Sequence, residues 1–553
     1  MFVHRHAPSQ RCFKGNRWLI PGDVAITDSR YMESSNTLWM RLPEEFSNDR
    51  LCVALGNRFE IRPLEVRHLT FWDTFEWGVW FGGCLLFNEG KHFHLCGREA
   101  GWIGSELCGE EISGGFPRFA RDFAAMRGSL GGLLGLRGLA PVLEVKFRQR
   151  TADVRNVTGK IICRIELVEA SVGKRTRDVS LRCCRIVPLR GYAPEASPVA
   201  EVLAALGAEP LGDGPLEFLL QSQGSAPREY TLRPVFGLKS EDPARKAFGR
   251  IVHAMLMIAR SNEGGILSDL DTEFLHDYRI CIRKIRSALG LIKGVYPEEE
   301  TLRMRSILRN LACETNCLRD LDVYLLAREE YLSLLPPAFQ PALDLMFQDF
   351  ASERSRAFRK VSSHMRSPAR VRFFEELEAF FQEDAPHPPS SSSELPVGPL
   401  VFRRIYKRYR KIRQSACGLG PDAPDEVLHG LRIQCKKLRY LMEFFAELIP
   451  QDKAAAMEKP LRRLQGRLGD FNDGSVQQKF LLDYWDKKQR ASGGQTGMAL
   501  SLGGLISILH YRRQQHREKI QEVLAAFLSP ATAELFKQTF RLPAIEPTEL
   551  PIP

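Results

Sequence analysis

The sequence predicts a multidomain α+β protein, in which an antiparallel, barrel-like β domain precedes an all-α part made of two duplicated helical bundles. Three observations predict this organisation. Short β-prone runs separated by glycine-rich breaks fill the region from about 36 to 236. From about 243 onward, apolar residues recur with a helical period. A basic motif occurs twice within that helical part, and the two copies are followed by the same landmarks in the same order.

The length of 553 residues allows several domains, each able to bury its own core. The run that begins Asp384-Ala-Pro-His-Pro-Pro-Ser cannot continue a helix and is predicted to be a linker. We therefore expect a disordered or extended segment at 1–33, the β domain at 34–236, a first helical half at 243–382, the linker at 383–398 and a second helical half at 399–540.

Composition restricts the class of protein. The net charge of +11 indicates an acidic partner, although charge alone does not say which one. Thirteen cysteines without any CxxC pair are typical of reduced thiols in the cytoplasm. Cys313 and Cys317 could form half of a metal site, but no second pair lies nearby, so we predict no zinc and no cofactor. The absence of an apolar run of ~20 residues predicts a cytoplasmic protein that does not cross a membrane.

The β domain is predicted from a series of runs that favour strands. They contain β-branched and aromatic residues and lie between turn-forming stretches. The runs are Leu51-Val53, Trp77-Phe81, Val142-Phe147, Lys160-Val168 and Val179-Val187.

The duplicated motif has the pattern His-x-x-Arg-x-x-x-(Arg/Lys)-x-x-Arg. Offsets of 3, 7 and 10 return to nearly one face of a helix, so each copy predicts a cationic stripe about 15 Å long. The apolar stripe of each window lies one position away, so one face packs while its neighbour faces a groove. Such a stripe matches a linear polyanion. The first copy is His276, Arg279, Arg283 and Arg286, and the second is His429, Arg432, Lys436 and Arg439.

Further landmarks recur in both helical halves. Leu318-Arg-Asp-Leu-Asp322 corresponds to Leu468-Gly-Asp-Phe-Asn472, and a base precedes each acidic position by eleven residues, Arg309 and Lys459. We expect Asp320, Asp322, Asp470 and Asp473 to anchor helices and to orient arginines, because carboxylates facing an anionic ligand would repel it. Chelation of a metal by the motif histidines and these acids is the alternative.

The densest basic cluster lies at the start of the second helical half. Its apolar residues mark one helical face, so the bases cover much of the remaining circumference. Like charges at this spacing oppose helix formation, which suggests a functional reason for them. The cluster consists of Arg403, Arg404, Lys407, Arg408, Arg410, Lys411 and Arg413, with no acid between them.

The two motif windows strongly resemble the signature helices of the CHAD family, over about residues 243–540. The resemblance implies two pseudo-symmetric helical bundles that face one another and line a basic pocket for inorganic polyphosphate. It also implies an association with polyphosphate granules, and CHAD domains often follow a CYTH domain.

The β region resembles the CYTH family of triphosphate tunnel enzymes at three places. These are His68-Leu-Thr-Phe-Trp-Asp-Thr74, the strand from Leu139 to Arg150, and Pro188-Leu-Arg-Gly-Tyr192. The first strand of that family needs an E-x-E-x-K motif to hold divalent metals, and here it reads Thr37-Leu-Trp39-Met-Arg41. The later acidic strand is also altered. Lys146, Arg148, Arg150, Glu166 and Glu169 are the tunnel-type charges that remain.

We therefore predict a polyphosphate-binding protein with an inactive CYTH-like domain, and we assign no catalytic and no metal-binding residues. Two alternatives stay open: an inorganic triphosphatase in the β domain with the CHAD part recruiting substrate, and nucleic-acid binding by the basic helices, where Phe402, Tyr406 and Tyr409 could stack on bases. Either motif histidine could contact the ligand or serve a structural role. The predicted binding residues are the two motif sets, Arg309, Arg319, Lys437 and Lys459, and the cluster Arg403, Arg404, Lys407, Arg408, Arg410 and Lys411.

Overall fold

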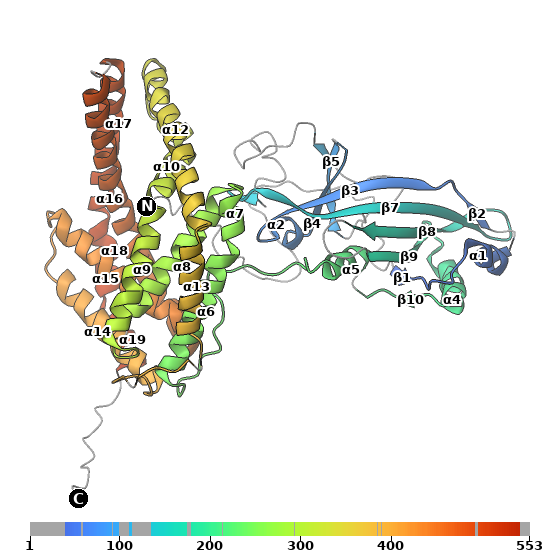
Figure 1. Cartoon of the computed structure of the whole chain (residues 1–553), viewed down its shortest axis with the longest axis horizontal. Helices are drawn as coiled ribbons and strands as arrows, with labels where there is room; N and C mark the ends of the chain where they lie inside the picture. The colour runs from blue at the N-terminus through green and yellow to red at the C-terminus, as the bar shows by residue number, and fades with distance from the viewer. Residues whose placement is uncertain are drawn as a thin grey trace, which may run out of the picture. The chain divides into compact units, whose positions relative to one another are not determined.

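The structure is a computed structural model that describes residues 39–541, except 57–58, 91, 99–109, 113–133, 174–178, 213, 292, 384, 389 and 493–495. The segment expected at 1–33 lies outside the described residues. The described chain forms two compact units, which divide between Tyr230 and Thr231 (Figure 1). The first contains the strands and the second contains only helices, so the α+β fold class is confirmed.

The β unit contains a single antiparallel sheet with the strand order β10-β1-β9-β8-β7-β3-β4-β5-β6, and β2 pairs with β7. The described pairings form an open path rather than a closed barrel. The strands are β1 Trp39–Arg41, β2 Phe59–Ile61, β3 Glu65–Thr74, β4 Cys84–Glu89, β5 His92–Gly97, β6 Glu110–Ile112, β7 Leu139–Arg155, β8 Ile161–Val172, β9 Val179–Pro188 and β10 Glu209–Pro210. The helices of this unit are α1 Asn48–Leu55, α2 Gly78–Phe81, α4 Ser197–Ala205 and α5 Pro215–Ser222.

The length of β7 explains why the sheet has two cores. In its first half Leu143, Val145 and Phe147 point to one face, where they pack with residues of α5. In its second half Ala152 and Val154 point to the opposite face, where they pack with residues of α1 and α4. Side chains alternate between the faces of a strand, so one strand can serve both cores at different positions along its length.

The described elements of the second unit are helices, as its apolar periodicity predicted. In the described part of the chain no helix is both long enough and apolar enough to cross a membrane. Its helices are α6 Ala244–Ser261, α7 Glu263–Leu267, α8 Thr272–Leu291, α9 Glu298–Glu314, α10 Asn316–Leu326, α11 Arg328–Ser333, α12 Gln340–Met365, α13 Pro368–Phe380, α14 Val397–Ala416, α15 Asp425–Phe444, α16 Gln451–Ser492, α17 Thr496–Glu518, α18 Ile520–Leu528 and α19 Pro530–Phe540.

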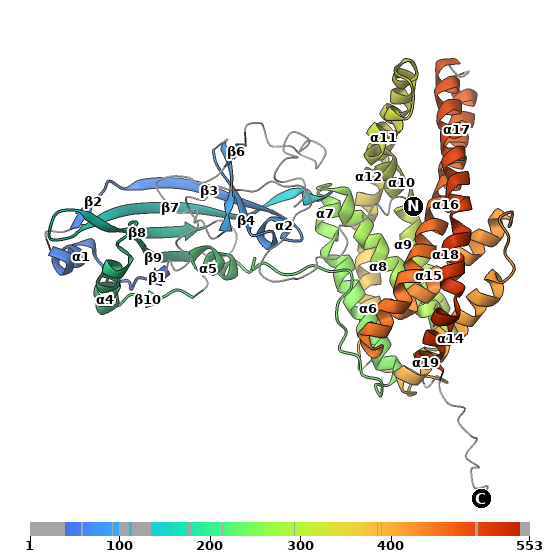
Figure 2. The same ribbon diagram turned by 180° about the vertical axis from the view of Figure 1, so that it is seen from behind.

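The two helical halves share a core. Leu343 and Phe350 of α12 pack in one cluster with Leu481 of α16 and Leu502 of α17, and α16 and α17 run side by side in both views (Figures 1 and 2). Between α13 and α14 the described residues form no helix, and there Ser392 N donates to Gly294 O at 2.7 Å. The halves are therefore joined by apolar packing as well as by the intervening segment.

Candidate anion-binding site

The two motif helices, α8 and α15, pack against each other within the helical unit. A buried ion pair joins them, with Lys284 Nζ 2.6 Å from Glu443 Oε1. Burial lowers the pKa values of Arg432 and Lys436 on α15, and the nearby charge of Arg283 on α8 lowers them further. The fold thus brings together two basic stripes that are far apart in the sequence.

Arg283, Arg432, Lys436 and Arg439 form the central cluster of this site. Burial, followed by the charges of Arg432 and Arg283, lowers the pKa of Lys436 from 10.5 to about 7. The charge of Asp473 raises the pKa of Lys436. The same carboxylate also pairs with Arg432, since Arg432 Nη2 lies 3.3 Å from Asp473 Oδ1. Arg283 and Arg439 each bury an Nε atom that has no hydrogen-bond partner among the described residues. The four bases of the cluster thus lie close together, with Asp473 beside Arg432 and the charge of Glu443 near Arg439.

A second set of bases, the rim cluster, continues from the central cluster. Burial lowers the pKa of Lys437, and the charges of Arg408, Lys411 and Arg305 lower it further. Arg408 is held in place by a 2.6 Å hydrogen bond from its Nη1 to Gln434 Oε1. Burial also lowers the pKa of Arg286 on α8, and the charges of Arg305 and Arg309 on α9 lower it further. The rim cluster comprises Arg286, Arg305, Arg309, Arg408, Lys411 and Lys437.

Arg305 was not among the residues that the sequence predicted. It lies one helical turn before Arg309 on α9, so the i,i+4 spacing was a signal that could have identified it. Its importance depends on α9 approaching both Arg286 and Lys437, which belong to different halves of the duplication. Only the packing of the helices shows that proximity.

Arg279 holds helices together in this structure. Its Nη1 donates to Ala312 O at 2.8 Å and to Thr315 Oγ1 at 2.6 Å, and its Nη2 donates to Asn316 Oδ1 at 2.8 Å. Burial lowers the pKa of Arg279 to about 10. These three bonds tie α8 to the junction of α9 and α10, so Arg279 borders the central cluster with two of its nitrogens already engaged.

The two copies of the motif are consequently not equivalent. In the first half the helix breaks at Thr315, and the carbonyl of Ala312 at the end of α9 accepts from Arg279. In the second half α16 continues unbroken through the corresponding region, where Gln465 Nε2 donates to Cys435 O at 2.6 Å. The residue that matches Arg279 is Arg432, and its partner is the carboxylate of Asp473.

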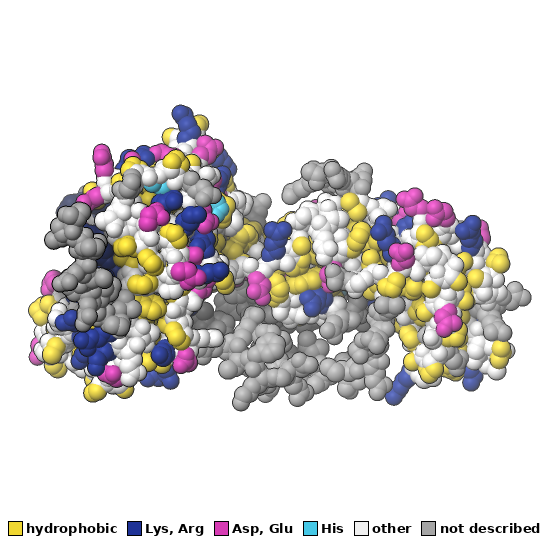
Figure 3. Space-filling view, turned by 90° about the horizontal axis from the view of Figure 1, so that it is seen from below, with side chains coloured by type: hydrophobic (Ala, Val, Ile, Leu, Met, Phe, Trp, Pro, Cys, Tyr) yellow, Lys and Arg dark blue, Asp and Glu magenta, His cyan; other side chains and the backbone are white. Residues whose placement is uncertain are grey.

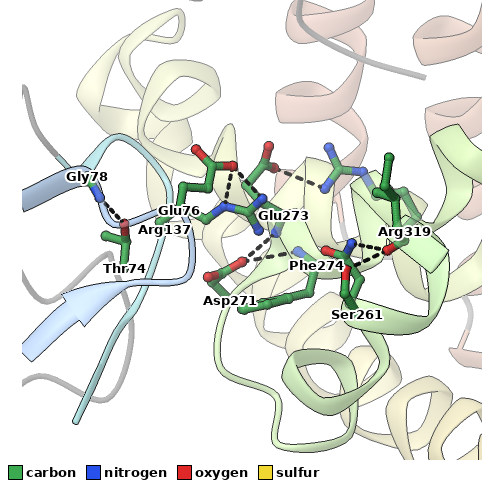
Figure 4. A network of polar contacts seen from close by, with 11 residues as sticks. Thr74, Glu76, Gly78, Arg137, Ser261, Asp271, Glu273, Phe274 and Arg319 are labelled. Atoms are coloured by element: carbon green, nitrogen blue, oxygen red, sulfur yellow. Dashed lines mark hydrogen bonds and ion pairs between the residues drawn. The ribbon is translucent and has the colours of Figure 1, made fainter. Parts of the chain in front are cut away.

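Arg319 also has a structural position. Its Nη1 donates to Thr272 O at 3.0 Å and lies 3.5 Å from Glu273 Oε1, at the first turn of α8 (Figure 4). The carboxylate of Asp271 accepts from the backbone N–H groups of Glu273 and Phe274 in the same view. Such a side chain stabilises a helix start by satisfying its free donors. This network fixes the end of α8 from which the motif begins.

The histidines mark the outer end of each stripe. His429 is exposed, and its Nδ1 lies 2.6 Å from Asn472 Oδ1, which orients the ring. His276 is half-buried in α8. Lys459 is exposed on α16, and no described contact connects it to the central or rim cluster.

The four predicted anchoring acids occupy different environments. Asp322 is buried and accepts from Arg354 Nε of α12 at 2.6 Å, while Asp473 pairs with Arg432. Asp470 lies 3.7 Å from both Arg467 and His516. Burial raises the pKa of Asp320, and the charges of Arg279 and Arg319 oppose that shift. Each of these acids therefore faces at least one base within the helical unit.

The basic residues of α14 fall into two rows. Arg404, Arg408 and Lys411 form the inner row, which lies toward Lys437. Arg403, Lys407 and Arg410 repeat the same 4- and 3-residue steps one position earlier, so they lie about 100° further around the helix. These three form the outer row, and all are exposed. Arg413 is exposed as well.

The β unit separates the charges that the CYTH resemblance grouped together. Arg148 and Glu169 are paired across β7 and β8 and share one face, on which Lys146 and Arg150 also lie. Glu166 pairs with Thr151 and so lies on the opposite face, where it is buried against Arg185. The five residues therefore do not converge on one site.

The carboxylates on the face of Glu166 are already occupied by arginines. Asp153 lies 2.8 Å from Arg62 and 3.2 Å from Arg164, and Glu166 is paired with Arg185. In the described parts of the chain, no three His, Cys, Asp or Glu side chains form a group that could hold a metal ion.

The Asp-Thr pair that suggested a CYTH strand has a clear local role. Asp73 is buried, and its carboxylate accepts from the backbone N–H groups of Thr74, Val79 and Trp80 at 2.7–2.9 Å. Thr74 Oγ1 accepts from Gly78 N at 2.8 Å. The pair therefore fixes the turn from β3 into α2.

The comparisons with known proteins identify the helical unit. The family model of the CHAD domain matches residues 250–482, a range that contains both motif helices. Residues 250–482 of this chain are a CHAD domain, and the resemblance predicted from the two motif windows is confirmed. The CYTH resemblance of the β unit stays a prediction.

Two uncharacterized proteins of Mycobacterium tuberculosis, from strains CDC 1551 / Oshkosh and ATCC 25618 / H37Rv, are similar to this chain. Each is 26% identical over 247 residues, which is 44% of this chain and 45% of the relative. The match thus spans less than half of the length of these relatives.

Three solved structures also resemble parts of the chain. The CHAD domain of the plant Ricinus communis is 23% identical, covering 53% of this chain and 96% of that domain, with a TM-score of 0.45. PptA from Streptomyces chartreusis is 17% identical, covering 51% of this chain and 99% of PptA, with a TM-score of 0.38. A candidate adenylyl cyclase of Hippeastrum, described as having a dominant triphosphatase activity, is 19% identical, covering 34% of this chain and 95% of its own, with a TM-score of 0.21.

Proposed function

We propose that this protein binds inorganic polyphosphate at the site between α8 and α15, and that it acts as a polyphosphate-associated or granule-associated binding protein. The CHAD family membership of residues 250–482 supports a role related to polyphosphate. The carrying observation is the central cluster, in which the bases Arg283, Arg432, Lys436 and Arg439 come together from two helices. An anion placed among these bases would interact favourably with all of them.

The chemistry of the cluster suits phosphate groups. Guanidinium groups present planar, paired donors that match two phosphate oxygens, and a lysine adds a compact charge. The buried Nε atoms of Arg283 and Arg439 are donors that still lack a partner among the described residues. Polyphosphate has no nucleobases, so a protein can recognise it only by the charge and spacing of its phosphate groups. The rim cluster continues the cationic surface beyond the central cluster, as a linear ligand requires.

Two of the three aromatic residues that left nucleic-acid binding as an alternative are packed against other aromatic rings of the helical unit. Tyr409 is 1% exposed and stacks on Phe536 with ring centroids 3.9 Å apart. Phe402 packs edge-on against Phe540. Rings held in this way are not available to stack on bases, so two of the three aromatics no longer support that alternative.

We assign no catalytic role to the β unit. Its buried carboxylates Asp153 and Glu166 are each engaged by arginines, and Glu166 lies on the face of the sheet opposite the other four tunnel-type charges. A triphosphatase would need carboxylates free to hold divalent metal ions. Incubating the full chain with tripolyphosphate and Mg²⁺ or Mn²⁺ should release no phosphate above background, and steady turnover would contradict this assignment.

The binding proposal is tested by titrating the full chain with long-chain polyphosphate. A variant with Arg283→Gln and Lys436→Gln loses two central charges. Hydrogen bonds to charged groups contribute ~1.5–3 kcal/mol each, so we expect the Kd to rise at least about tenfold. A control with Lys160→Gln and Arg190→Gln removes the same charge from exposed positions of the β unit and should bind like the wild type.

Specificity is tested with single-stranded DNA of the same total charge. We expect polyphosphate to bind more tightly, because the site offers close-set donors for phosphate, while Phe402 and Tyr409 are packed against other rings. Equal Kd values for both polymers, or equal losses in the control variant and the central variant, would contradict a specific polyphosphate site.

A further inference from the structure

The outer row of α14 is a strongly cationic surface that the central site does not use. Arg403, Lys407 and Arg410 are exposed, and none of them has a hydrogen bond or ion pair with any residue that the structure describes. Elsewhere in the helical unit bases commonly meet acids, as Arg354 does with Asp269 and Asp322. The outer row is therefore an unneutralised surface of the fold.

The sequence around α14 supplies no acid that could compensate this charge. From residue 395 to residue 421 the chain contains no aspartate or glutamate. Figure 3 shows one face of the protein, on which basic, acidic and hydrophobic side chains all occur. A solvated helix face normally mixes both signs, since opposite charges at i,i+4 stabilise it and like charges destabilise it.

Packing does not explain the outer row either. The buried face of α14 is filled by apolar side chains such as Val401, Ile405 and Ile412, and Tyr409 stacks on α19. The bases could be replaced by neutral helix formers without loss of these contacts. Their crowding costs helix stability and gives no packing in return, which points to a ligand that restores the balance.

The outer row also lies on a different side of α14 from the inner row. The inner row of α14 lies toward Lys437 and the rim cluster, whereas the outer row lies about 100° further around the same helix. An anionic chain held along α8 and α15 is met by the inner row. The outer row is left open to a second anionic chain.

We propose that the outer row of α14 is a second, separate polyphosphate-binding surface, so that one protein molecule can bridge two polyphosphate chains. The class of ligand in this inference rests on the proposed function, whereas the existence of the basic surface does not. Two sites on one molecule would join chains into a network, because each bound protein holds one chain beside another. Cross-linking of polyphosphate is thus an activity beyond simple binding in the pocket.

The test uses the full chain and two populations of long-chain polyphosphate, one labelled with a fluorescence donor and one with an acceptor. Energy transfer between the labels reports that two chains are held together. The outer-row variant carries Arg403→Gln, Lys407→Gln and Arg410→Gln, and it should fold normally because glutamine favours helix and the like charges are removed. The control variant carries Lys160→Gln, Arg190→Gln and Lys293→Gln, three exposed bases elsewhere.

We expect energy transfer with the wild type and the control, and its loss in the outer-row variant. The outer-row variant should still bind tripolyphosphate with a Kd within about twofold of the wild-type value, since screened surface charges contribute little to a short ligand in the pocket. The central variant with Arg283→Gln and Lys436→Gln should lose both signals.

The two proposals fail in different ways. If the wild type binds no polyphosphate at all, the proposed function is wrong. If it binds but shows no energy transfer, or if the outer-row variant retains transfer through association of protein copies, only the second surface is wrong. A third outcome is that the outer-row variant binds long chains more weakly while the wild type shows no energy transfer. One chain would then wrap both sites, and the bridging of two chains would be wrong.

Discussion

Replacing Lys436 by methionine tests the electrostatics of the central cluster directly. Methionine keeps the unbranched apolar stem and removes the ammonium group. The pKa of this lysine is 10.5 in an unfolded chain and about 7 in the fold, mainly because of burial. Each pH unit corresponds to ~1.4 kcal/mol, so burying the charged form costs up to ~5 kcal/mol of stability.

The pH dependence of this effect has a definite sign. Below pH 7 the lysine is charged in both states, so the fold bears the full cost and the methionine variant gains the most. Between about pH 7 and pH 10.5 the unfolded wild-type chain binds more protons than the folded chain, so wild-type stability rises with pH. The advantage of the variant should therefore shrink as the pH rises and be ~2–3 kcal/mol smaller at pH 9 than at pH 6.

Urea unfolding of the full chain, followed by helical circular dichroism at pH 6 and pH 9, measures the difference. Lys459→Met is the matched control, because Lys459 is an exposed lysine on α16. Added polyphosphate should stabilise the wild type more than the Lys436→Met variant, since a ligand that binds only the folded state stabilises it more when it binds more tightly. A variant that is less stable than the wild type at both pH values would refute the charge imbalance.

Three further variants test contacts that stabilise each unit from within. Glu443→Gln leaves Lys284, which is 5% exposed, without its carboxylate and should lower the free energy of unfolding by ~3–5 kcal/mol, whereas Lys284→Met combined with Glu443→Leu should recover most of that loss in the same urea titration. If the single and double variants are equally stable, the ion pair is not the contact that joins α8 to α15. Asp73→Ala removes the acceptor of three backbone N–H groups and should destabilise the β unit by ~2–3 kcal/mol, measured as an earlier loss of its tryptophan fluorescence signal, and an unchanged transition would mean that the turn into α2 does not need this cap.

The helical unit was predictable because its signals are local. The step of apolar residues through α8 and α15 follows from the sequence, and so does the placement of four basic positions on one face of each helix. The family resemblance depended on the same windows. The antiparallel β unit followed from alternating, β-prone runs, but its open strand path did not, because register and pairing of distant strands leave little trace in a single sequence.

The site itself could be predicted only in part. Arg279 and Arg283 look alike in the motif, yet Arg279 is tied to Thr315 and Asn316 while Arg283 buries an unpartnered Nε. The break in the helix at Thr315 causes this difference, and its counterpart in α16 has no break. In the β unit, Glu166 and Glu169 are three residues apart and were grouped together, but strand alternation sends them to opposite faces.

By itself, the sequence determined which helices carry the basic stripes, and it predicted a duplicated helical part and an anionic partner. These properties depend on residue type and on spacing within one helix, which neighbouring residues along the chain define. Tertiary structure alone decided that Arg283 lies beside Lys436, that Arg305 joins the rim, and that one of the two basic rows of α14 lies toward Lys437. Charges on separate helices interact only at the distances that packing sets, and burial changes their strength, so neither can be read from the order of residues.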